Sequence, residues 1–474
     1  MKGRPKALAR LIIYFALIIT SSAHATDNQT DDLSPILSEA GLPFTVQITQ
    51  ANFQLPNGLH SGAVGVYKGH WIFIAGRTNG LHGFGSDPFP IISQNTMVYV
   101  VNSQTGAVNS RSLRDRSSGL TQQQIDTLSV TSPESYQDST TLYMAGGYGV
   151  NSSAGTFDTK PVLTAINLPG IYQWVMQPGN ARNNVVQNIQ QIYHPIFQVT
   201  GGRMYKLGNI TQLIFGQNFT GVYDPGTSGD YSEQVRQFQI KEIRGQFTAV
   251  ILPSTPRTPD ANYRRRDLNI LPALLNKNNL LEYGYVAYAG VFTPASGVWT
   301  VPVVIDGSGN PVMADPTLLR TFKQSMNHYV CASTSLYSSS STNMYHIFFG
   351  GMSYGYYAGG VFQTDSEIPF INQVTAVKMD KDGYFTQYLM NNEYPVILST
   401  TVNPGNPFLF GAGAYFIPSN ISKYPNNVIN LDNIRSATVI GHIVGGIQST
   451  VPNTNTDADS SASPHVFVVT LVPR

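Results

Sequence analysis

One short phrase recurs along this chain: an apolar run that ends in glycine, often in two glycines. Its six copies occupy residues 71–76, 142–147, 213–216, 286–290, 347–351 and 443–446. Counted from the first glycine of each copy, at positions 76, 146, 216, 290, 350 and 445, the steps are 70, 70, 74, 60 and 95 residues. Self-similarity at a long, nearly regular period indicates a fold built from one repeated supersecondary unit. We therefore expect six related units along the chain.

A second feature follows five of the copies. It consists of a strand-like run, a polar turn with glycine, and a further strand-like run. β-Branched and aromatic residues dominate these runs, and glycine supplies the positive φ that tight hairpin turns require. The five segments are residues 96–113, 162–176, 235–252, 299–316 and 374–390. Each unit is therefore expected to carry an outer β-hairpin after its glycine-ended strand.

The sixth copy has only half of such a hairpin. After Gly446 the chain runs through a polar loop into the apolar segment 465–471 and ends soon afterwards. The segment 41–48, before the first copy, has the character of the missing strand. A ring of units leaves its first and last members unjoined, so strands from the two ends can complete one sheet and remove exposed edges. We expect residues 44–48 to pair beside residues 466–471.

An apolar run that ends in Gly-Gly, followed by a loop and a hairpin, resembles the kelch repeat. Glycine pairs stand at residues 146–147, 350–351 and 445–446, and single glycines at 76, 216 and 290. Trp174 is the one counterpart of the family's hairpin tryptophan. The resemblance covers about residues 42–474 and implies an all-β, six-bladed β-propeller like the galactose oxidase central domain. It implies four strands per blade, with the first strand lining a central channel.

The resulting domain prediction has three parts. Residues 1–25 form a signal peptide, residues 26–40 a linker, and residues 41–474 a single propeller domain. The blades are expected near residues 61–113, 127–176, 196–252, 267–316, 328–390 and 408–474, the last completed by 42–50. The 95-residue last step leaves room for extra strands, so five or seven blades stay open as alternatives.

The N-terminal segment has the pattern of a secretory signal. Four basic residues precede the apolar run 11–19, and Ala23-His24-Ala25 provides an A-x-A cleavage site before Thr26. The apolar run is shorter than the roughly 20 residues that span a bilayer, and an uncleaved membrane anchor is the alternative. We expect an exported protein that is periplasmic, on the cell surface or extracellular, with no integral membrane span in the mature chain.

Charge and cysteine content narrow the function further. The chain has 28 basic and 27 acidic residues, and removal of the leader leaves 24 basic residues against the same 27. This balance does not indicate a nucleic-acid binder. Cys331 is the single cysteine and lies in an apolar run, so it is interpreted as a small buried hydrophobic residue. We expect a monomer.

The family resemblance implies that the loops between the second and third strands gather at the channel mouth, where binding residues usually lie. The loop 77–95 contains an arginine directly after the glycine, the loop 217–234 has acidic residues and a tyrosine, and the loop 352–373 is rich in tyrosine. The candidate ligand-binding residues are Arg77, His82, Asp87, Asp224, Tyr231, Tyr354, Tyr356 and Asp365.

Other polar clusters point to structure rather than chemistry. Arg264, Arg265 and Arg266 are consecutive, so their side chains point in different directions, and we expect a solvated turn there. The nine histidines show no metal-ligand spacing. Neither a zincin motif nor a nucleophile elbow is present. The lone cysteine also argues against the copper radical chemistry of galactose oxidase. We expect no metal and no cofactor.

Two functions are compatible with these features. The first is a non-catalytic binding protein that recognises a carbohydrate or a protein through the loop face. The second is a sugar-acting enzyme, such as an epimerase or mutarotase similar to periplasmic kelch propellers that handle sialic acid. Arg77 and His82 would then hold substrate and move protons. Convergence of Arg77, His82 and carboxylates from other blades in one pocket would favour the enzyme.

Overall fold

The computed structural model describes residues 33–83, 87–179, 184–224, 229–243, 246–277, 280–295, 297–454, 456 and 458–474. The predicted signal peptide lies outside the described residues, as do residues 26–32 of the predicted linker. Within the described residues, which belong to the unit Leu33–Arg474, the chain is built from β-strands with two short α-helices. The prediction of an all-β fold is confirmed.

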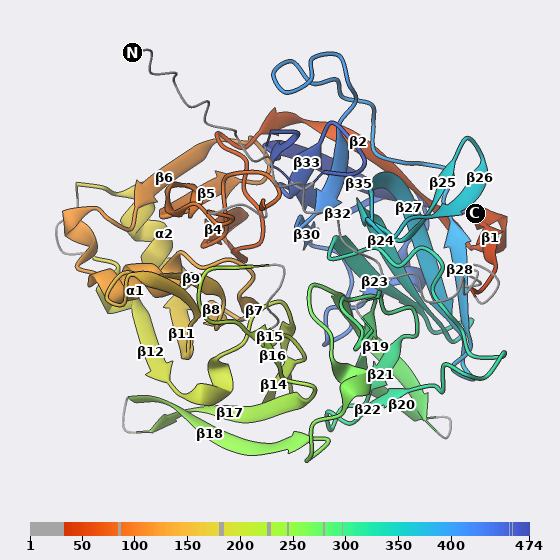
Figure 1. Cartoon of the computed structure of the whole chain (residues 1–474), viewed down its shortest axis with the longest axis horizontal. Helices are drawn as coiled ribbons and strands as arrows, with labels where there is room; N and C mark the ends of the chain where they lie inside the picture. Colours follow the sequence, from red (N-terminus) through yellow and green to blue (C-terminus); the bar gives the residue numbers. More distant parts are fainter. Residues whose placement is uncertain are drawn as a thin grey trace, which may run out of the picture. The chain divides into compact units, whose positions relative to one another are not determined.

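Six sheets of the described residues each contain a set of four neighbouring antiparallel strands. We number them sheet 1 to sheet 6 in chain order, and Figure 1 shows them following one another through the unit. Sheet 1 contains β3 (Ala63–Tyr67), β4 (His70–Ile74), β5 (Met97–Asn102) and β6 (Val108–Ser112). Sheet 2 contains β7 (Glu134–Asp138), β8 (Thr141–Ala145), β11 (Val162–Asn167) and β12 (Ile189–Tyr193). Sheet 3 contains β13 (Arg203–Leu207), β14 (Ile210–Ile214), β17 (Val235–Ile243) and β18 (Gln246–Thr255).

The other three sheets repeat this order of strands. Sheet 4 contains β19 (Asn269–Lys277), β20 (Leu280–Tyr288), β21 (Val303–Ile305) and β22 (Pro311–Met313). Sheet 5 contains β23 (Ala332–Ser338), β24 (Asn343–Met352), β27 (Phe370–Met379) and β28 (Phe385–Leu389), with β1 (Ile36–Ser38) and β31 (Ile429–Asn430) at its edges. Sheet 6 contains β30 (Tyr415–Pro418), β32 (Thr438–Val444), β35 (His465–Pro473) and β2 (Phe44–Gln54).

Shorter elements fill the connections. The small sheets are β9 (Tyr148–Asn151) with β10 (Thr156–Thr159), β15 (Gln217–Asn218) with β16 (Asp230–Tyr231), β25 (Gly355–Ala358) with β26 (Val361–Thr364), and β29 (Leu409–Ala412) with β33 (Ile447–Ser449) and β34 (Ser460–Ala462). The helices are α1 (Gln122–Leu128), α2 (Leu168–Met176) and the 3-10 turns η2 (Glu39–Gly41), η3 (Ile91–Ser93), η4 (Arg116–Ser118), η5 (Val186–Asn188), η6 (Pro195–Phe197), η7 (Ala261–Tyr263) and η8 (Leu431–Asn433).

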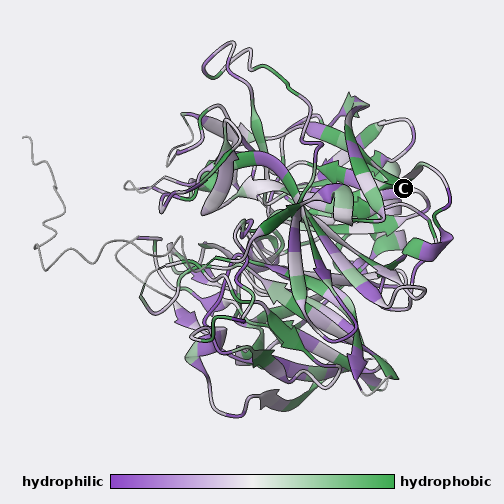
Figure 2. Ribbon diagram, turned by 90° about the vertical axis from the view of Figure 1, so that its right-hand side faces the viewer, coloured by the Kyte–Doolittle hydropathy of each residue, from purple (hydrophilic) through white to green (hydrophobic). Residues whose placement is uncertain are grey.

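Packing between consecutive sheets explains why the recurring phrase is apolar throughout. Large hydrophobic clusters lie between sheets 1 and 2, 2 and 3, 3 and 4, 4 and 5, 5 and 6, and 6 and 1. Ile72 of β4 packs in the cluster shared with sheet 2, and its neighbour Phe73 packs in the cluster shared with sheet 6. Because both faces of such a strand are buried, its sequence is continuously apolar rather than alternating. Figure 2 shows hydrophobic residues concentrated on the strands.

Two consecutive residues with positive φ end the second strand of every sheet. The first of the two has φ between 55° and 67°, which alanine or phenylalanine can adopt at some strain, and the second has φ between 85° and 98°. The second residue is glycine in all six sheets, and a Cβ on Gly147 would lie 2.4 Å from the Val130 side chain. The equivalent glycines are therefore 76, 147, 216, 290, 351 and 446, so counting from the first glycine of each pair is one residue out of phase in three copies.

Backbone hydrogen bonds join the connections that lead into the six sheets. One residue in each connection donates its amide to the equivalent carbonyl of the preceding sheet, at 2.7–3.3 Å. The six bonds run from Ser132 to Ser61, Gly201 to Ser132, Asp267 to Gly201, Val330 to Asp267, Gly413 to Val330 and Ser61 to Gly413. The bonds form a complete cycle, so the six connections hold one another at a common centre. We call these six residues the central ring.

The two ends of the chain share sheet 6. β2 pairs antiparallel with β35, and its residues 44–48 lie opposite residues 469–473. Figure 1 shows the red strand β2 beside the blue strand β35. The buried Glu39 carboxylate accepts hydrogen bonds from Arg474 Nη2 at 2.5 Å and from Asn391 Nδ2 at 2.8 Å. The predicted pairing of the N-terminal strand with the C-terminal strand is confirmed.

Short extra elements inside sheet 6, and in the segment that leads into it, explain why the last two copies of the glycine-ended run are 95 residues apart. The connection between β30 and β32 contains β31 and η8, and a further irregular segment, 390–408, precedes β29. β31 pairs with β23 of sheet 5, and β29 pairs with β33. In the described chain these short strands therefore enlarge existing connections and do not form a further four-stranded sheet.

The predicted hairpin at 162–176 is wrong. β11 is followed by the helix α2, and the fourth strand of sheet 2, β12, begins only at Ile189. Asn167 caps the helix by accepting a hydrogen bond from the amide of Gly170, and Pro169 lies in the first turn, where proline is tolerated. Trp174 is fully buried on the helix face that packs against sheet 1. Asn167 and Pro169, which begin this helix, are residue types that also occur in turns, and the sequence pattern therefore predicts a hairpin here.

Candidate functional site

A cavity of about 110 Å³ lies at the central ring, and we call it the mouth pocket. All six sheets contribute to it through equivalent positions. Twelve lining residues are the pairs that precede each first strand: 60–61, 131–132, 200–201, 266–267, 329–330 and 412–413. Five more directly follow the strand-ending glycines, namely Arg77, Tyr148, Gln217, Met352 and Ile447. The remaining lining residues, Gly80, Leu81, His82, Phe89, Phe219 and Tyr223, come from the loops.

Arg77 is held rigidly in the wall of this pocket. Its Nε donates to Asn79 Oδ1 and its Nη2 donates to the Pro90 carbonyl, each at 3.0 Å. The guanidinium lies 5.0 Å from the centre of the Phe89 ring, and the residue is 2% exposed. Burial lowers the pKa of Arg77 to about 10, opposed by the nearby Asp87 carboxylate. Arg77 therefore carries a positive charge at neutral pH with two of its three nitrogens already bonded to protein.

Arg266 supplies a second cation from sheet 4. Its Nη1 lies 2.7 Å from Asp267 Oδ2, and its Nε donates to the Tyr231 hydroxyl at 3.0 Å. Both side chains of the ion pair are largely buried, at 14% and 16% exposure. Burial opposes the charge on Arg266, but the Asp267 carboxylate and the neighbouring tyrosines together outweigh burial and raise the pKa of the guanidinium above its usual range. The lining thus holds two guanidinium groups against one carboxylate.

The predicted solvated turn at the three arginines is wrong. Arg265 is fully buried, donates to the Val301 carbonyl at 2.9 Å and lies 4.4 Å from the centre of the Trp299 ring. Burial lowers the pKa of Arg265 to about 9. Arg264 lies 4.0 Å from the Tyr231 ring centre. The three side chains do point in different directions. Each of them contacts protein, because the segment crosses from sheet 3 to sheet 4 at the central ring.

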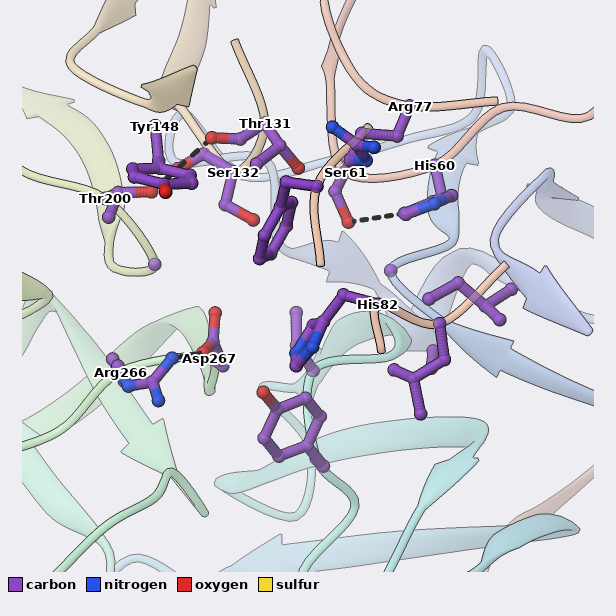
Figure 3. Close-up of a pocket in the computed structure, with 18 of the residues that line it drawn as sticks. His60, Ser61, Arg77, His82, Thr131, Ser132, Tyr148, Thr200, Arg266 and Asp267 are labelled. Carbon is purple, nitrogen blue, oxygen red and sulfur yellow. Dashed lines mark hydrogen bonds and ion pairs between the residues drawn. The ribbon is translucent and has the colours of Figure 1, made fainter. Parts of the chain in front are cut away.

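Two histidines of the pocket are neutral at physiological pH. Burial lowers the pKa of His60 to about 3, with Arg77 adding to the effect, and His60 Nε2 lies 3.0 Å from the Asn79 carbonyl oxygen. Burial also lowers the pKa of His82, whose ring stacks on Phe89 with 5.0 Å between centroids. A neutral imidazole can donate one hydrogen bond and accept another. Figure 3 shows His82, Ser61, Ser132 and Asp267 around one open centre.

Aromatic rings form one wall of the pocket. Phe89, Tyr148, Phe219 and Tyr223 contact one another edge-to-face or tilted, with centroids 5.3–5.7 Å apart. Burial and the Asp267 carboxylate raise the pKa of Tyr329, on the sheet 5 side, well above its usual range. The pocket therefore combines apolar ring surfaces with neutral hydroxyl groups and two fixed cations.

The structure brings some of the predicted site residues together and leaves others outside. Arg77 and His82 line the mouth pocket, and Tyr231 supports it by bonding Arg266. Asp87 and Asp224 are exposed beyond the lining. The other three also lie outside it. Tyr354 is 8% exposed, Tyr356 lies on β25, where its hydroxyl donates to Gln363 at 3.4 Å, and Asp365 accepts a bond from Asn453 at 2.9 Å.

Several lining residues of the mouth pocket are not among the site residues predicted from the sequence. Tyr148 and Gln217 directly follow strand-ending glycines, as Arg77 does, so the corrected glycine phase identifies them. Ser61, Ser132 and Asp267 belong to the central ring, and each lies two residues before the first strand of its sheet. No local motif marks these positions, because only the cycle of hydrogen bonds makes them equivalent.

Other expectations concern residues outside the pocket. Cys331 is buried as predicted, and burial raises the pKa of its thiol to about 12. Within the described ranges, no three His, Cys, Asp or Glu side chains are grouped so that they could hold a metal ion. Neither α-helix in the described part of the chain has the length and apolar character needed to cross a bilayer.

Comparisons with known proteins give little further guidance. No protein-family model matches the chain, and no curated protein matches it. Among solved structures, one titled "Structure of YjhT" aligns with a TM-score of 0.43 at 12% sequence identity. The alignment covers 88% of this chain and 98% of that one.

Proposed function

We propose that this chain is an exported, six-bladed β-propeller of the kelch type whose mouth pocket binds a small carbohydrate that carries an anionic group. The blade count is supported by six sheets, six interlayer clusters and the closed cycle of the central ring. The shared sheet 6 supports closure by an N-terminal strand. Export is supported by the basic and apolar pattern of the first 25 residues.

The observation that carries the ligand class is the presence of Arg77 and Arg266 in one small cavity in which Asp267 is the single carboxylate among the described lining residues. Arginine forks bind planar carboxylates through paired, charge-assisted hydrogen bonds, and these are strongest where water is excluded. With His60 and His82 neutral, the lining has a net charge of about +1 near pH 7. An anionic ligand is therefore favoured over a neutral or cationic one.

The remaining lining supports a sugar ring as the body of this ligand. A cavity of about 110 Å³ is of the same order as the roughly 150 Å³ that holds a benzene ring, so it suits one ring rather than a polymer. The aromatic wall offers a ring face, and Ser61, Ser132 and Thr131 offer hydroxyl groups. A protein partner on the loop face has less support, because Tyr354 is buried and Tyr356 lies outside the pocket.

A sugar-acting enzyme is the second candidate. The observation in its favour is that His82, Tyr329 and Asp267 all line the pocket that contains the two arginines. A neutral imidazole and a carboxylate can each take a proton from a bound ligand, and a protonated phenol can donate one. These groups make proton transfer possible in the same pocket.

Calorimetric titration with sugar acids tests the binding proposal. We expect glucuronate or galacturonate to bind, and the matching neutral sugar to bind at least about 100-fold more weakly, the scale of a lost charged pair in a buried site. Arg77→Gln should remove the preference for the acid, while Arg320→Gln, at an exposed site, should leave it unchanged. Equal affinity for acid and neutral sugar, or no binding at all, would refute the proposal. Saturation-transfer NMR on the bound acid then separates binder from enzyme, since only an enzyme exchanges the ligand's ring protons or anomers.

A further inference from the structure

A second cavity, of about 440 Å³, lies between sheets 2 and 3, and we call it the side groove. It is lined by residues of β8, β11, β12, β17 and β18 together with η5, and these strands lie next to one another in Figure 1. Thr141, which lines it, begins β8, whereas the far end of β8 leads to Tyr148 in the mouth pocket. The side groove is therefore separate from the mouth pocket and lies toward the opposite end of the strands.

Two aromatic rings form an apolar surface in the side groove. Tyr143 of β8 and Phe247 of β18 stack with 6.2 Å between centroids and 28° between planes. Tyr143 also stacks on Tyr136 of β7, at 5.1 Å. Both lining rings are half-buried, so they are fixed by neighbours and still reach solvent. Held in this way, the rings offer apolar contact area at little cost in side-chain entropy.

Uncharged polar side chains surround these rings. Gln187 and Gln190 are exposed, and within the described residues neither side-chain amide has a hydrogen-bond partner. Asn167 and Thr141 add further donors and acceptors to the lining. Each amide offers both donor and acceptor atoms, which is the combination that matches a sugar hydroxyl group.

The charge of the side groove is balanced. Its charged lining residues are Lys241 and Glu242, which are adjacent, exposed and of opposite sign. Among its described lining residues there is no buried cation or carboxylate, in contrast to the mouth pocket. An anion therefore gains no net attraction here. The volume lies within the roughly 300–1,000 Å³ of ordinary ligand sites.

We infer that the side groove is a second ligand site and that it binds a neutral oligosaccharide. The stacked rings of Tyr143 and Phe247 pack against the apolar face of a sugar ring, and the amides of Gln187 and Gln190 bond its hydroxyl groups. The groove is large enough for more than one sugar ring, whereas the mouth pocket accepts one. This site does not depend on the function proposed for the mouth pocket.

Titration of the full mature chain with neutral trisaccharides (maltotriose, cellotriose and chitotriose) tests this inference. At least one should bind, Tyr143→Ala should weaken its binding at least tenfold, and the double variant Gln187→Ala with Gln190→Ala should weaken it about fivefold. Tyr384→Ala, at an exposed tyrosine outside the groove, is the matched control and should leave binding unchanged. The double variant changes only exposed side chains, so it remains informative if Tyr143→Ala fails to fold.

Two results would overturn the inference: no trisaccharide binds at millimolar concentration, or binding is unaffected by both groove variants. The mouth variant Arg77→Gln distinguishes this outcome from failure of the first proposal. It should weaken binding of the sugar acid to the level of the neutral sugar and leave binding of the trisaccharide intact. Loss of trisaccharide binding in Arg77→Gln with no change in the groove variants would place the trisaccharide in the mouth pocket and refute the second site.

Discussion

The mouth pocket and the side groove use the same sheets in opposite ways. The mouth pocket forms where six connections meet, so its polar groups are buried and its charges are paired or bonded to protein. The side groove forms between two sheets, and its Gln187, Gln190, Lys241 and Glu242 side chains are exposed. Burial thus separates a site that can select by charge from one that can select only by shape and hydrogen bonding.

The largest difference expected between the two regions concerns stability. Arg266→Gln leaves the Asp267 carboxylate in the mouth pocket without its ion-pair partner, and breaking a buried pair typically costs about 3–5 kcal/mol. We expect the free energy of unfolding in urea to fall by about 3 kcal/mol. Arg266→Lys should lose less stability than Arg266→Gln, because lysine keeps the positive charge but lacks the paired hydrogen-bond donors of the guanidinium group.

The matched change in the side groove is Gln190→Ala. Exposed substitutions away from special features usually alter stability by less than about 0.5 kcal/mol. A similar loss in Arg266→Gln and Gln190→Ala, or no loss in either, would contradict the division of the molecule into a buried charged site and an exposed neutral one.

A second difference should appear in the pH dependence of stability. Glu134 opens β7 two residues after the central ring and is fully buried. Burial raises its pKa well above the usual range, despite the nearby Arg236 and Arg203. The folded state therefore favours the protonated acid, so stability is complete below the unfolded pKa near 4.5 and is lost as pH rises toward the folded pKa.

Glu134→Gln removes this titration. We expect the stability of the variant relative to the parent to increase with pH above 4.5, by up to about 1.4 kcal/mol per pH unit until the folded pKa is reached. Urea unfolding of the variant and the parent at several pH values between 4 and 8 measures this difference in stability. Glu242→Gln, at the exposed side groove, is the control and should give a flat difference. A flat difference for Glu134→Gln would show that its carboxyl is solvated.

The smallest expected effect is the pH dependence of binding. Because burial keeps the pKa of His82 below its ordinary value of 6.5 and holds the pKa of His60 near 3, neutral imidazole is the main form of both at pH 7 and above. Sugar-acid affinity should change less than about twofold between pH 7 and 8 and then increase at lower pH, as a proton on His82 adds positive charge. Calorimetry between pH 5 and 8 checks this. The trisaccharide in the side groove should show no such rise. A strong fall in acid binding from pH 7 to 8 would indicate a histidine that is charged near neutrality.

Much of the architecture could be predicted because its causes are local. The six apolar runs are buried on both faces, and the strand-ending glycine is required by a φ near 90°. The pairing of residues 44–48 with the C-terminal strand could be predicted because the sixth unit has only half of a hairpin and the N-terminal segment has the character of the missing strand. The helix α2 was missed because Asn167 and Pro169 are typical of turns as well as helix starts.

The sequence by itself determined the strand pattern, the repeat and the position of Arg77 directly after a strand-ending glycine. Only the tertiary structure decided that Ser61, Ser132 and Asp267 meet at one centre, that Arg266 is buried beside Asp267, and that Tyr143 and Phe247 face a groove between two sheets. The reason is physical. Strand periodicity and turn φ angles act within a few residues, whereas these meetings depend on how six sheets are held around a cycle of hydrogen bonds between residues far apart in the chain.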